Sequence, residues 1–120
     1  MKKVLVADDK APNRELIRTI LEQAGHLVLE ASDRTEALRN AQQNRPDLIV
    51  LDLHMPMLDG FLVFEELRRD ERFAATPIIA LTASAMQGDR ERALAAGRTG
   101  YLAKPVSVGV FRREMERLLG

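Results

Sequence analysis

Short aliphatic runs alternate with amphipathic stretches five times along this chain. The runs are residues 4–7, 26–31, 48–53, 78–82 and 100–104. Each is followed by a stretch with apolar residues at helical spacing, at about residues 12–24, 34–41, 61–69, 85–96 and 108–119. Strands that alternate with helices through short connections form a parallel sheet covered on both faces. The alternation therefore restricts the chain to a small group of α/β folds.

The number of units and the length select one member of that group. A chain of 120 residues makes one domain, spanning residues 1–120, whereas an eight-fold barrel would need about twice as many. We predict an α/β fold of flavodoxin-like (βα)5 type: a doubly wound parallel sheet with strand order 2-1-3-4-5.

Charge and composition exclude several classes of protein. Lys and Arg together equal Asp and Glu at 18 each, so the chain lacks the basic field of a nucleic-acid-binding protein. There is no cysteine, and the first apolar run is too short for a signal sequence or a membrane span. We expect a cytoplasmic protein that binds neither nucleic acid nor membranes directly.

The first predicted helix has recognisable ends and one apolar face. Pro12 suits the first turn of a helix, and Gly25 suits the position just after its end. The residues predicted to face the sheet are Leu16, Ile17, Ile20, Leu21 and Ala24. A similar pattern places Asp33 and Glu36 at the start of the second helix.

The central run, residues 48–53, contains one carboxylate among aliphatic side chains. Such a run is typical of a strand buried on both faces, and Asp52 lies near its carboxyl end, before a loop that contains Pro56 and Gly60. Ligands of open α/β sheets bind at the carboxyl ends of the strands. A charged group there must be paired, hydrogen-bonded or bound to a metal.

Four strands end in residues that would meet in one crevice. The first supplies Asp8 and Asp9, the third Asp52, the fourth Thr82 and the fifth Lys104. Three carboxylates close together repel one another unless a cation compensates, and carboxylate oxygens are ligands that suit Mg²⁺. A carboxylate can also be the nucleophile of phosphoryl transfer, with a metal, an ammonium and a hydroxyl binding the phosphoryl oxygens. We therefore predict a Mg²⁺-dependent phosphoryl-transfer site.

This ordered set of motifs resembles the receiver domain of two-component response regulators. The motifs are Asp8-Asp9, Asp52 followed by residues 55–60, Thr82-Ala83, and residues 101–105. The resemblance covers the whole chain, which looks like the single-domain regulators of the CheY type and, over residues 104–119, of the DivK type. A receiver cut from a hybrid kinase or a larger regulator would look almost the same.

The resemblance implies a role for each site residue. Asp52 would become the 4-aspartylphosphate, with Lys104 binding a phosphoryl oxygen and a cis bond before Pro105. Asp9 and Asp52 would bind Mg²⁺ with the backbone carbonyl of His54, and Asp8 would act mainly through water. Thr82 and Tyr101 would be the switch pair. The chain would catalyse only its own phosphorylation and dephosphorylation, and so would not be a turnover enzyme.

The same resemblance implies two kinds of protein partner. A histidine kinase or a histidine phosphotransfer protein would donate the phosphoryl group, approaching over Asn13, Arg14 and Ile17. A downstream effector would dock on the surface formed by the helix around residues 86–95, the strand with Tyr101 and the helix that follows. We expect a monomer or a phosphorylation-dependent dimer.

Three other functions fit the sequence less well. An aspartate-nucleophile phosphatase carries a second acid two residues after the nucleophile, where this chain has His54. A receiver fold used only for docking would have lost Asp52, Asp9 or Lys104. A flavodoxin needs a Ser/Thr/Gly-rich phosphate loop after the first strand, where Asp8 and Asp9 would repel the phosphate.

Overall fold

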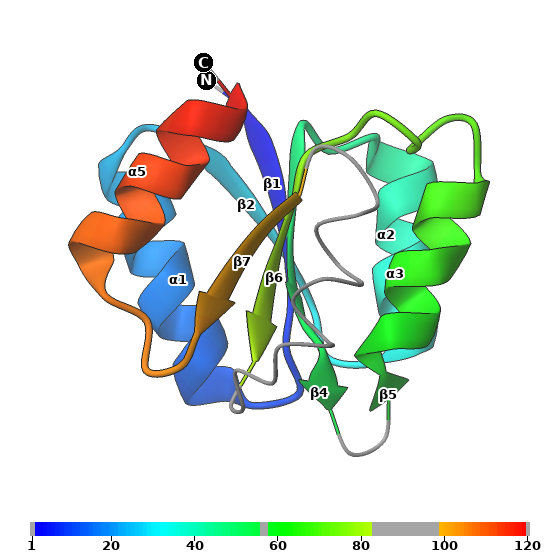
Figure 1. Ribbon diagram of the computed structural model, residues 1–120, viewed down its shortest axis with the longest axis horizontal. Coiled ribbons are helices and arrows are strands. Elements are labelled where there is room, and N and C mark those ends of the chain that lie inside the picture. The colour runs from blue at the N-terminus through cyan, green and yellow to red at the C-terminus, as the bar shows by residue number, and fades with distance from the viewer. Residues whose placement is uncertain (1, 56–57, 83–98, 120) are drawn as a thin grey trace.

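The computed structural model describes residues 2–55, 58–82 and 99–119. Five parallel strands form its main sheet in the order β2-β1-β3-β6-β7 (Figure 1). Their bounds are β1 Lys3–Ala7, β2 Leu27–Ala31, β3 Leu48–Asp52, β6 Ile78–Thr82 and β7 Thr99–Ala103. When these five strands are numbered by their order in the sequence, their order across the sheet is 2-1-3-4-5, as predicted. The predicted helix at residues 85–96 lies outside the described residues.

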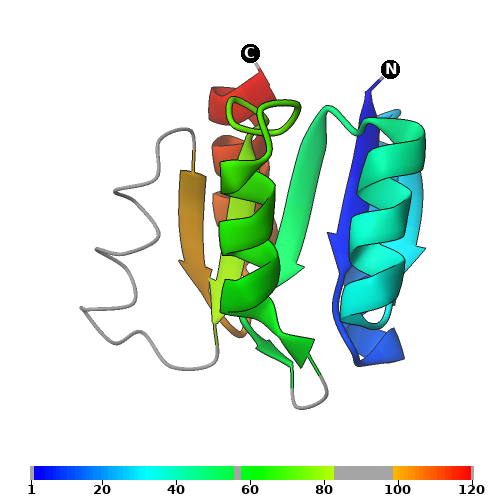
Figure 2. The same cartoon turned by 90° about the vertical axis from the view of Figure 1, so that its right-hand side faces the viewer.

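Four helices are described, two on each face of the sheet. Figure 1 shows α1 (Ala11–Gln23) and α5 (Val108–Leu119) on one side, and α2 (Arg34–Asn44) and α3 (Gly60–Arg69) on the other. The quarter turn in Figure 2 shows α2 and α3 side by side in front of the strands. None of the helices in the described ranges is both long and apolar enough to cross a bilayer.

The sheet separates two apolar cores because successive side chains of a strand point to opposite faces. In β1, Leu5 and Ala7 join the core under α2 and α3, whereas Val4 and Val6 join the core under α1 and α5. Every residue of β3 is buried, as expected for the middle strand of a sheet with helices on both faces.

The ends of α1 follow the predicted signals, but its apolar face is narrower than predicted. Pro12 lies in the first turn, and Gly25 adopts a φ of 86° that glycine tolerates without strain. Leu16 is 47% exposed and Ala24 is also exposed, so both were wrongly assigned to the core. Leu16 lies at the margin of the apolar stripe, and Ala24 is already the C-cap. The sheet is therefore contacted by Ile17, Ile20 and Leu21.

Several element boundaries differ by one residue from the prediction, and one small element was not predicted. The second strand begins at Leu27 rather than residue 26, β3 ends at Asp52 rather than residue 53, and β7 begins at Thr99. In the segment expected to be a loop, β4 (His54–Met55) pairs antiparallel with β5 (Leu58–Asp59). This hairpin lies just beyond the carboxyl end of β3 (Figure 1).

Candidate phosphoryl-transfer site

Three carboxylates converge at the carboxyl ends of β1 and β3. These strands are neighbours in the sheet, so Asp8, which directly follows β1, lies near Asp52, the last residue of β3. Asp8 and Asp52 are almost completely buried, whereas Asp9 is partly exposed. One carboxylate oxygen from each of the three lies within 4.8 Å of the other two. The fold therefore assembles the acidic cluster that was predicted from separate strand ends.

Lys104 enters this cluster from the end of β7. Its Nζ donates to Oδ2 of Asp52 at 3.0 Å and to Oδ2 of Asp8 at 3.2 Å. Its backbone N–H donates to the carbonyl oxygen of Thr82 at 2.7 Å, and the peptide bond to Pro105 is cis. Burial alone would lower the pKa of the Lys104 ammonium, but its hydrogen bonds and charge attraction to Asp52 and Asp8 outweigh burial and raise that pKa.

Within the described residues, the ammonium of Lys104 does not satisfy every carboxylate oxygen of the site. Oδ1 of Asp9 is buried and has no hydrogen-bond partner among the described residues. An unpartnered carboxylate oxygen is costly to bury, and a hard divalent cation with oxygen ligands would remove that cost. The donor set of three carboxylates therefore fits Mg²⁺.

Thr82 and Tyr101 lie on the adjacent strands β6 and β7. Thr82 ends β6, is fully buried and pairs in register with Ala103, next to Lys104. The ring of Tyr101 packs, partly buried, against the core under α2 and α3. The Tyr101 hydroxyl is buried, without a hydrogen-bond partner in the described part of the chain. His54, predicted to offer its backbone carbonyl, begins β4 two residues after Asp52.

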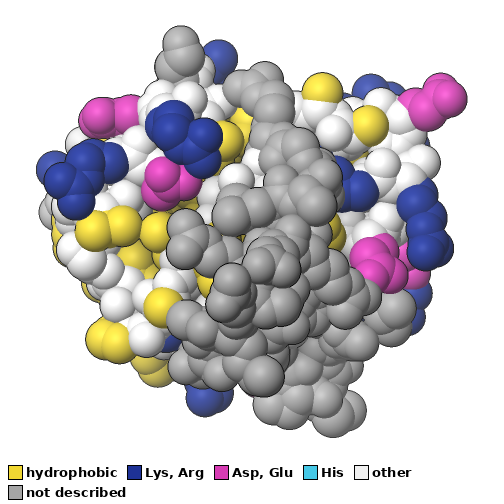
Figure 3. Space-filling model, in the orientation of Figure 1, with side chains coloured by type: hydrophobic (Ala, Val, Ile, Leu, Met, Phe, Trp, Pro, Cys, Tyr) yellow, Lys and Arg dark blue, Asp and Glu magenta, His cyan; other side chains and the backbone are white. Residues whose placement is uncertain are grey.

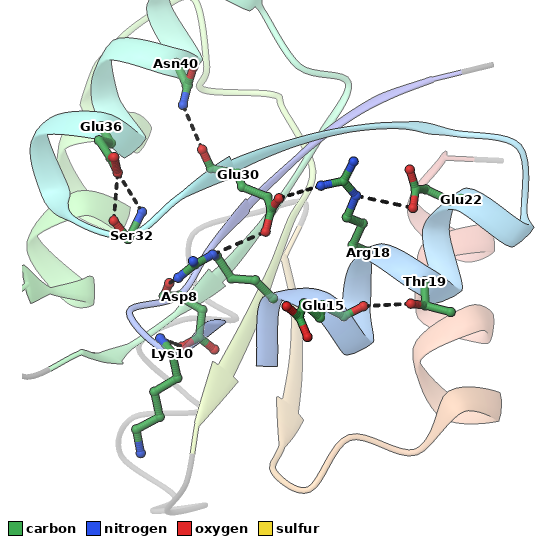
Figure 4. Close-up of polar contacts among 11 residues, drawn as sticks. Asp8, Lys10, Glu15, Arg18, Thr19, Glu22, Glu30, Ser32, Glu36 and Asn40 are labelled. Carbon is green, nitrogen blue, oxygen red and sulfur yellow. Dashed lines mark hydrogen bonds and ion pairs between the residues drawn. The ribbon is translucent and has the colours of Figure 1, made fainter. Parts of the chain in front are cut away.

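An ion-pair network behind Asp8 was not predicted. Arg14 in α1 donates from Nη1 to the carbonyl oxygen of Asp8 at 2.7 Å and from Nε to Oε1 of Glu30 at 3.3 Å. Arg18 donates to the other oxygen of Glu30 at 2.7 Å and pairs with Glu22. Figure 4 shows this network running from Asp8 to the far end of α1. In the sequence, the spacing of four residues places Arg14 and Arg18 on the same face of a helix. It does not indicate that Glu30 is their shared partner.

The sequence matches the model of a known protein family. The response regulator receiver domain model matches residues 4–116, almost the whole chain. The chain belongs to the response regulator receiver domain family. The polar-differentiation response regulator DivK of Brucella anthropi is 36% identical over 119 residues, which cover 99% of this chain and 97% of the relative.

Two solved receiver structures share the fold over the same span. The chemotaxis protein CheY4 of Vibrio cholerae superimposes with a TM-score of 0.91 at 34% identity, with 99% of each chain covered. The receiver domain of a sensor histidine kinase from Pseudomonas aeruginosa gives a TM-score of 0.87 at 39% identity, covering 99% of this chain and 98% of that one. That structure holds a magnesium ion in its active-site cleft.

Proposed function

We propose that this receiver is a signalling switch that accepts a phosphoryl group on Asp52 from the phosphohistidine of a histidine kinase or a phosphotransfer protein. The observation that carries the proposal is the position of Asp52: buried at the end of the central strand and bonded to Lys104 at 3.0 Å. It lies beside a second carboxylate, Asp9, whose Oδ1 has no hydrogen-bond partner in the part of the chain that the structure describes. We propose that residues 1–120 form a single receiver unit.

The transfer consists of one bond made and one broken. A carboxylate oxygen of Asp52 attacks the phosphorus and forms the O–P bond of an acyl phosphate. The P–N bond to the donor imidazole breaks, and its electron pair returns to the imidazole nitrogen, which then takes a proton from solvent. Lys104, held at the end of β7, binds a phosphoryl oxygen and offsets its negative charge.

The acidic cluster prepares the site for the charge of the incoming group. Mg²⁺ would be held by Asp9, Asp52 and the His54 carbonyl, with Asp8 acting through water, and would neutralise phosphoryl oxygens. Since Asp52 would be phosphorylated and dephosphorylated once per signalling cycle, the chain would modify only itself and would not be a turnover enzyme.

The donor protein is proposed to approach beside α1. A cavity of about 90 Å³ at the carboxyl edge of the sheet is lined by Asn13, Leu16, Ile17, Leu81, Lys104, Pro105 and Val106. Leu16 on its wall is 47% exposed, and Val108 and Val110 on α5 are also exposed. In Figure 3, exposed hydrophobic side chains gather on the side that carries α1 and α5. An apolar surface next to the reacting carboxylate suits a protein donor.

The output is proposed to leave through β7 and α5. If the Thr82 hydroxyl moves toward a phosphoryl oxygen, the Tyr101 ring gains space into which it can turn. In the present ring position its hydroxyl is buried without a partner among the described residues, so turning outward would let it bond to water or to an effector protein. We propose a cytoplasmic receiver, monomeric or dimerising on phosphorylation.

Labelling with acetyl phosphate and Mg²⁺ tests the phosphorylation site. The wild-type chain should gain one base-labile phosphoryl group, and Asp52→Asn should gain none. Asp70→Asn, which removes a partly exposed aspartate that pairs with Arg72 on the turn after α3, is the control and should label normally. Full labelling of Asp52→Asn would disprove the assignment.

Tyrosine fluorescence tests the switch. The chain has one tyrosine and no tryptophan, so this signal reports on Tyr101 alone. Adding beryllofluoride, which mimics the phosphoryl group, should change both the fluorescence and the amide shifts of β7. Amide shifts confined to the loops around Asp9, Asp52 and Lys104 would reject the switch.

A receiver module of a larger kinase is the second candidate. The 39% identity to a receiver domain from a sensor histidine kinase favours it. Phosphotransfer profiling against the complete set of histidine kinases of the host separates the two. A module acts with one parent kinase, whereas a free regulator exchanges with separate proteins.

A further inference from the structure

The guanidinium of Arg14 connects the backbone of Asp8 to the carboxylate of Glu30. Arg14 lies in the first turn of α1 and Glu30 lies on β2, so the side chain spans from the helix to the edge strand. Its two bonds use two different nitrogens of the planar fork, Nη1 and Nε. The Arg14 side chain is only 18% exposed, so the two bonds are partly shielded from water. Together they fix the guanidinium in one orientation.

The Asp8 carbonyl that Arg14 holds belongs to the peptide unit that joins Asp8 to Asp9. Because this unit is planar, fixing its oxygen also fixes the direction in which the chain continues to Asp9. The preceding side of Asp8 is held as well, since its N–H donates to the carbonyl of Ala31 at 3.0 Å. Its carboxylate accepts from the backbone N–H of Lys10 at 2.9 Å and from Lys104. Every polar atom of Asp8 thus has a partner.

Asp9 is placed in a different way. Its Oδ1 is buried and has no partner among the described residues, so that oxygen is not anchored by a hydrogen bond. The position of the Asp9 carboxylate therefore depends on the backbone on either side of it. On the following side α1 begins at Ala11, and on the preceding side the backbone is held by Arg14.

Glu30 acts as the anchor of Arg14. Its second oxygen accepts from Arg18 at 2.7 Å, and its backbone carbonyl accepts from Nδ2 of Asn40 at 3.1 Å, as Figure 4 shows. Arg18 makes ion pairs of the same kind as Arg14, one turn further along the same helix. Among the described residues it bonds to Glu22 and Glu30 and not to Asp8, and its side chain is 46% exposed. Arg18 is therefore a matched comparison for Arg14.

We infer that Arg14 is a positioning residue for the metal site, which holds the Asp8–Asp9 peptide so that the Asp9 carboxylate faces the acidic cluster. The inference rests on the proposed function, because it assumes that Asp9 binds Mg²⁺. A purely electrostatic role of Arg14 would have the opposite effect on Mg²⁺ affinity. Losing a positive charge near three carboxylates would strengthen cation binding, whereas losing the positioning bond weakens it.

Mg²⁺ titrations of the full chain, followed by backbone amide shifts, measure this effect. Arg14→Gln should weaken Mg²⁺ binding by about tenfold, the lower end of the effect of groups that orient metal ligands. Arg14→Lys should also weaken it, because one ammonium keeps the charge but cannot reproduce the two-pronged contact. The Mg²⁺ affinity of Arg18→Gln should remain within about twofold of that of the wild type, since this variant keeps the bond from Arg14 to Asp8.

A double variant shows whether the effect passes through Asp9. In an Asp9→Asn background, adding Arg14→Gln should cause no further loss of Mg²⁺ affinity. Urea unfolding without Mg²⁺ confirms that each variant is folded under the titration conditions. If Arg14→Gln does not fold, Glu30→Gln replaces it; removing the anchor should weaken Mg²⁺ binding about threefold, below the range for direct orienting groups.

The outcomes separate this inference from the proposed function. If Asp9→Asn removes Mg²⁺ binding while Arg14→Gln and Arg14→Lys bind as tightly as the wild type or more tightly, the positioning role is wrong and the metal site stands. If the wild-type chain binds no Mg²⁺, or binds it equally well with Asp9→Asn, both the metal site and the positioning role are overturned.

Discussion

Lys104 and Asp52 are separated by 52 positions in the sequence, yet Nζ of the lysine lies 3.0 Å from Oδ2 of the aspartate. The same ammonium contacts Asp8, so one cation serves two buried carboxylates. In the absence of metal, this ammonium offsets part of their charge within the described part of the chain. It therefore has two tasks, to support the folded chain without metal and to bind the phosphoryl group.

Replacing Lys104 with Met should destabilise the metal-free chain. We expect a loss of about 2 kcal/mol in the free energy of unfolding, less than the roughly 3–5 kcal/mol for breaking a fully buried pair. The reduction follows from the 21% exposure of the Lys104 side chain. Urea unfolding measures the loss, and added Mg²⁺ should restore part of it. Lys10→Met, at an exposed lysine nearby, should be close to neutral; an equal loss in both would contradict the bridging role.

Replacing Tyr101 with Phe should leave the chain as stable as the wild type or stabilise it by up to about 1 kcal/mol. The reason is that the hydroxyl is buried without a partner in the described part of the chain, so its removal ends a desolvation cost. Thr99→Val is the control on the same strand, because the Thr99 hydroxyl accepts from Arg68 at 3.0 Å and its loss should destabilise. A clear destabilisation by Tyr101→Phe in thermal unfolding would mean that the hydroxyl is bonded.

Arg68 should contribute more to stability than any ordinary surface arginine. It donates to the carbonyls of Phe73, Ala74 and Thr76, and so ties the turn after α3 to the start of β7 through Thr99. We expect Arg68→Met to lose about 2–3 kcal/mol, since several partly buried carbonyls lose their donor. The neighbouring Arg69 is 79% exposed with one weak pair at 3.9 Å, so Arg69→Met should lose less than about 0.5 kcal/mol. Equal losses in urea unfolding would refute the prediction.

Glu36 should make stability depend on pH in the acidic range. Hydrogen bonds from the backbone N–H and the hydroxyl of Ser32 lower the pKa of its carboxyl below the usual value. A lowered pKa in the folded chain adds stability above the unfolded pKa of about 4.3, and this stability is lost as the pH falls through the folded pKa. Glu36→Gln should therefore have a lower free energy of unfolding than the wild type at pH 7. At pH 3 the difference between the two proteins should be smaller.

The control for this effect is Glu116→Gln, at an exposed glutamate of α5. Its stability should follow that of the wild type at both pH values in urea unfolding. A Glu36→Gln variant whose difference from the wild type stays constant with pH would show that the hydrogen bonds to Ser32 contribute nothing to the pH dependence.

The order of strands and helices was predictable because it depends on local periodicity. Residues 48–53 were predicted to be a strand buried on both faces, and the observed strand, Leu48–Asp52, is buried at every residue. The convergence of Asp8 and Asp52 followed from the same prediction, since adjacent parallel strands end at the same edge. That convergence depends on the order of the elements along the chain and not on contacts between particular side chains.

The features that were missed depend on tertiary contacts. The β4–β5 hairpin pairs only two residues from each strand, too few to produce an alternating pattern. Leu16 fits the apolar spacing of α1, but its exposure depends on how far the neighbouring elements extend over the helix. The contact between Arg14 and Glu30 requires α1 to pack beside β2 with Glu30 level with Val6, a register that the sequence does not encode locally.

The two separate cores have a consequence for how such a domain can diversify. Substitutions that repack Ile20 or Met115 on the inner faces of α1 and α5 are separated by the whole sheet from Val63 and Leu67 on the inner face of α3. Distant sites without shared partners have nearly additive effects on stability. The α1–α5 layer, on which the phosphoryl donor is proposed to dock, can thus acquire a new partner preference by successive mutations. The packing of the α2–α3 layer need not change at the same time.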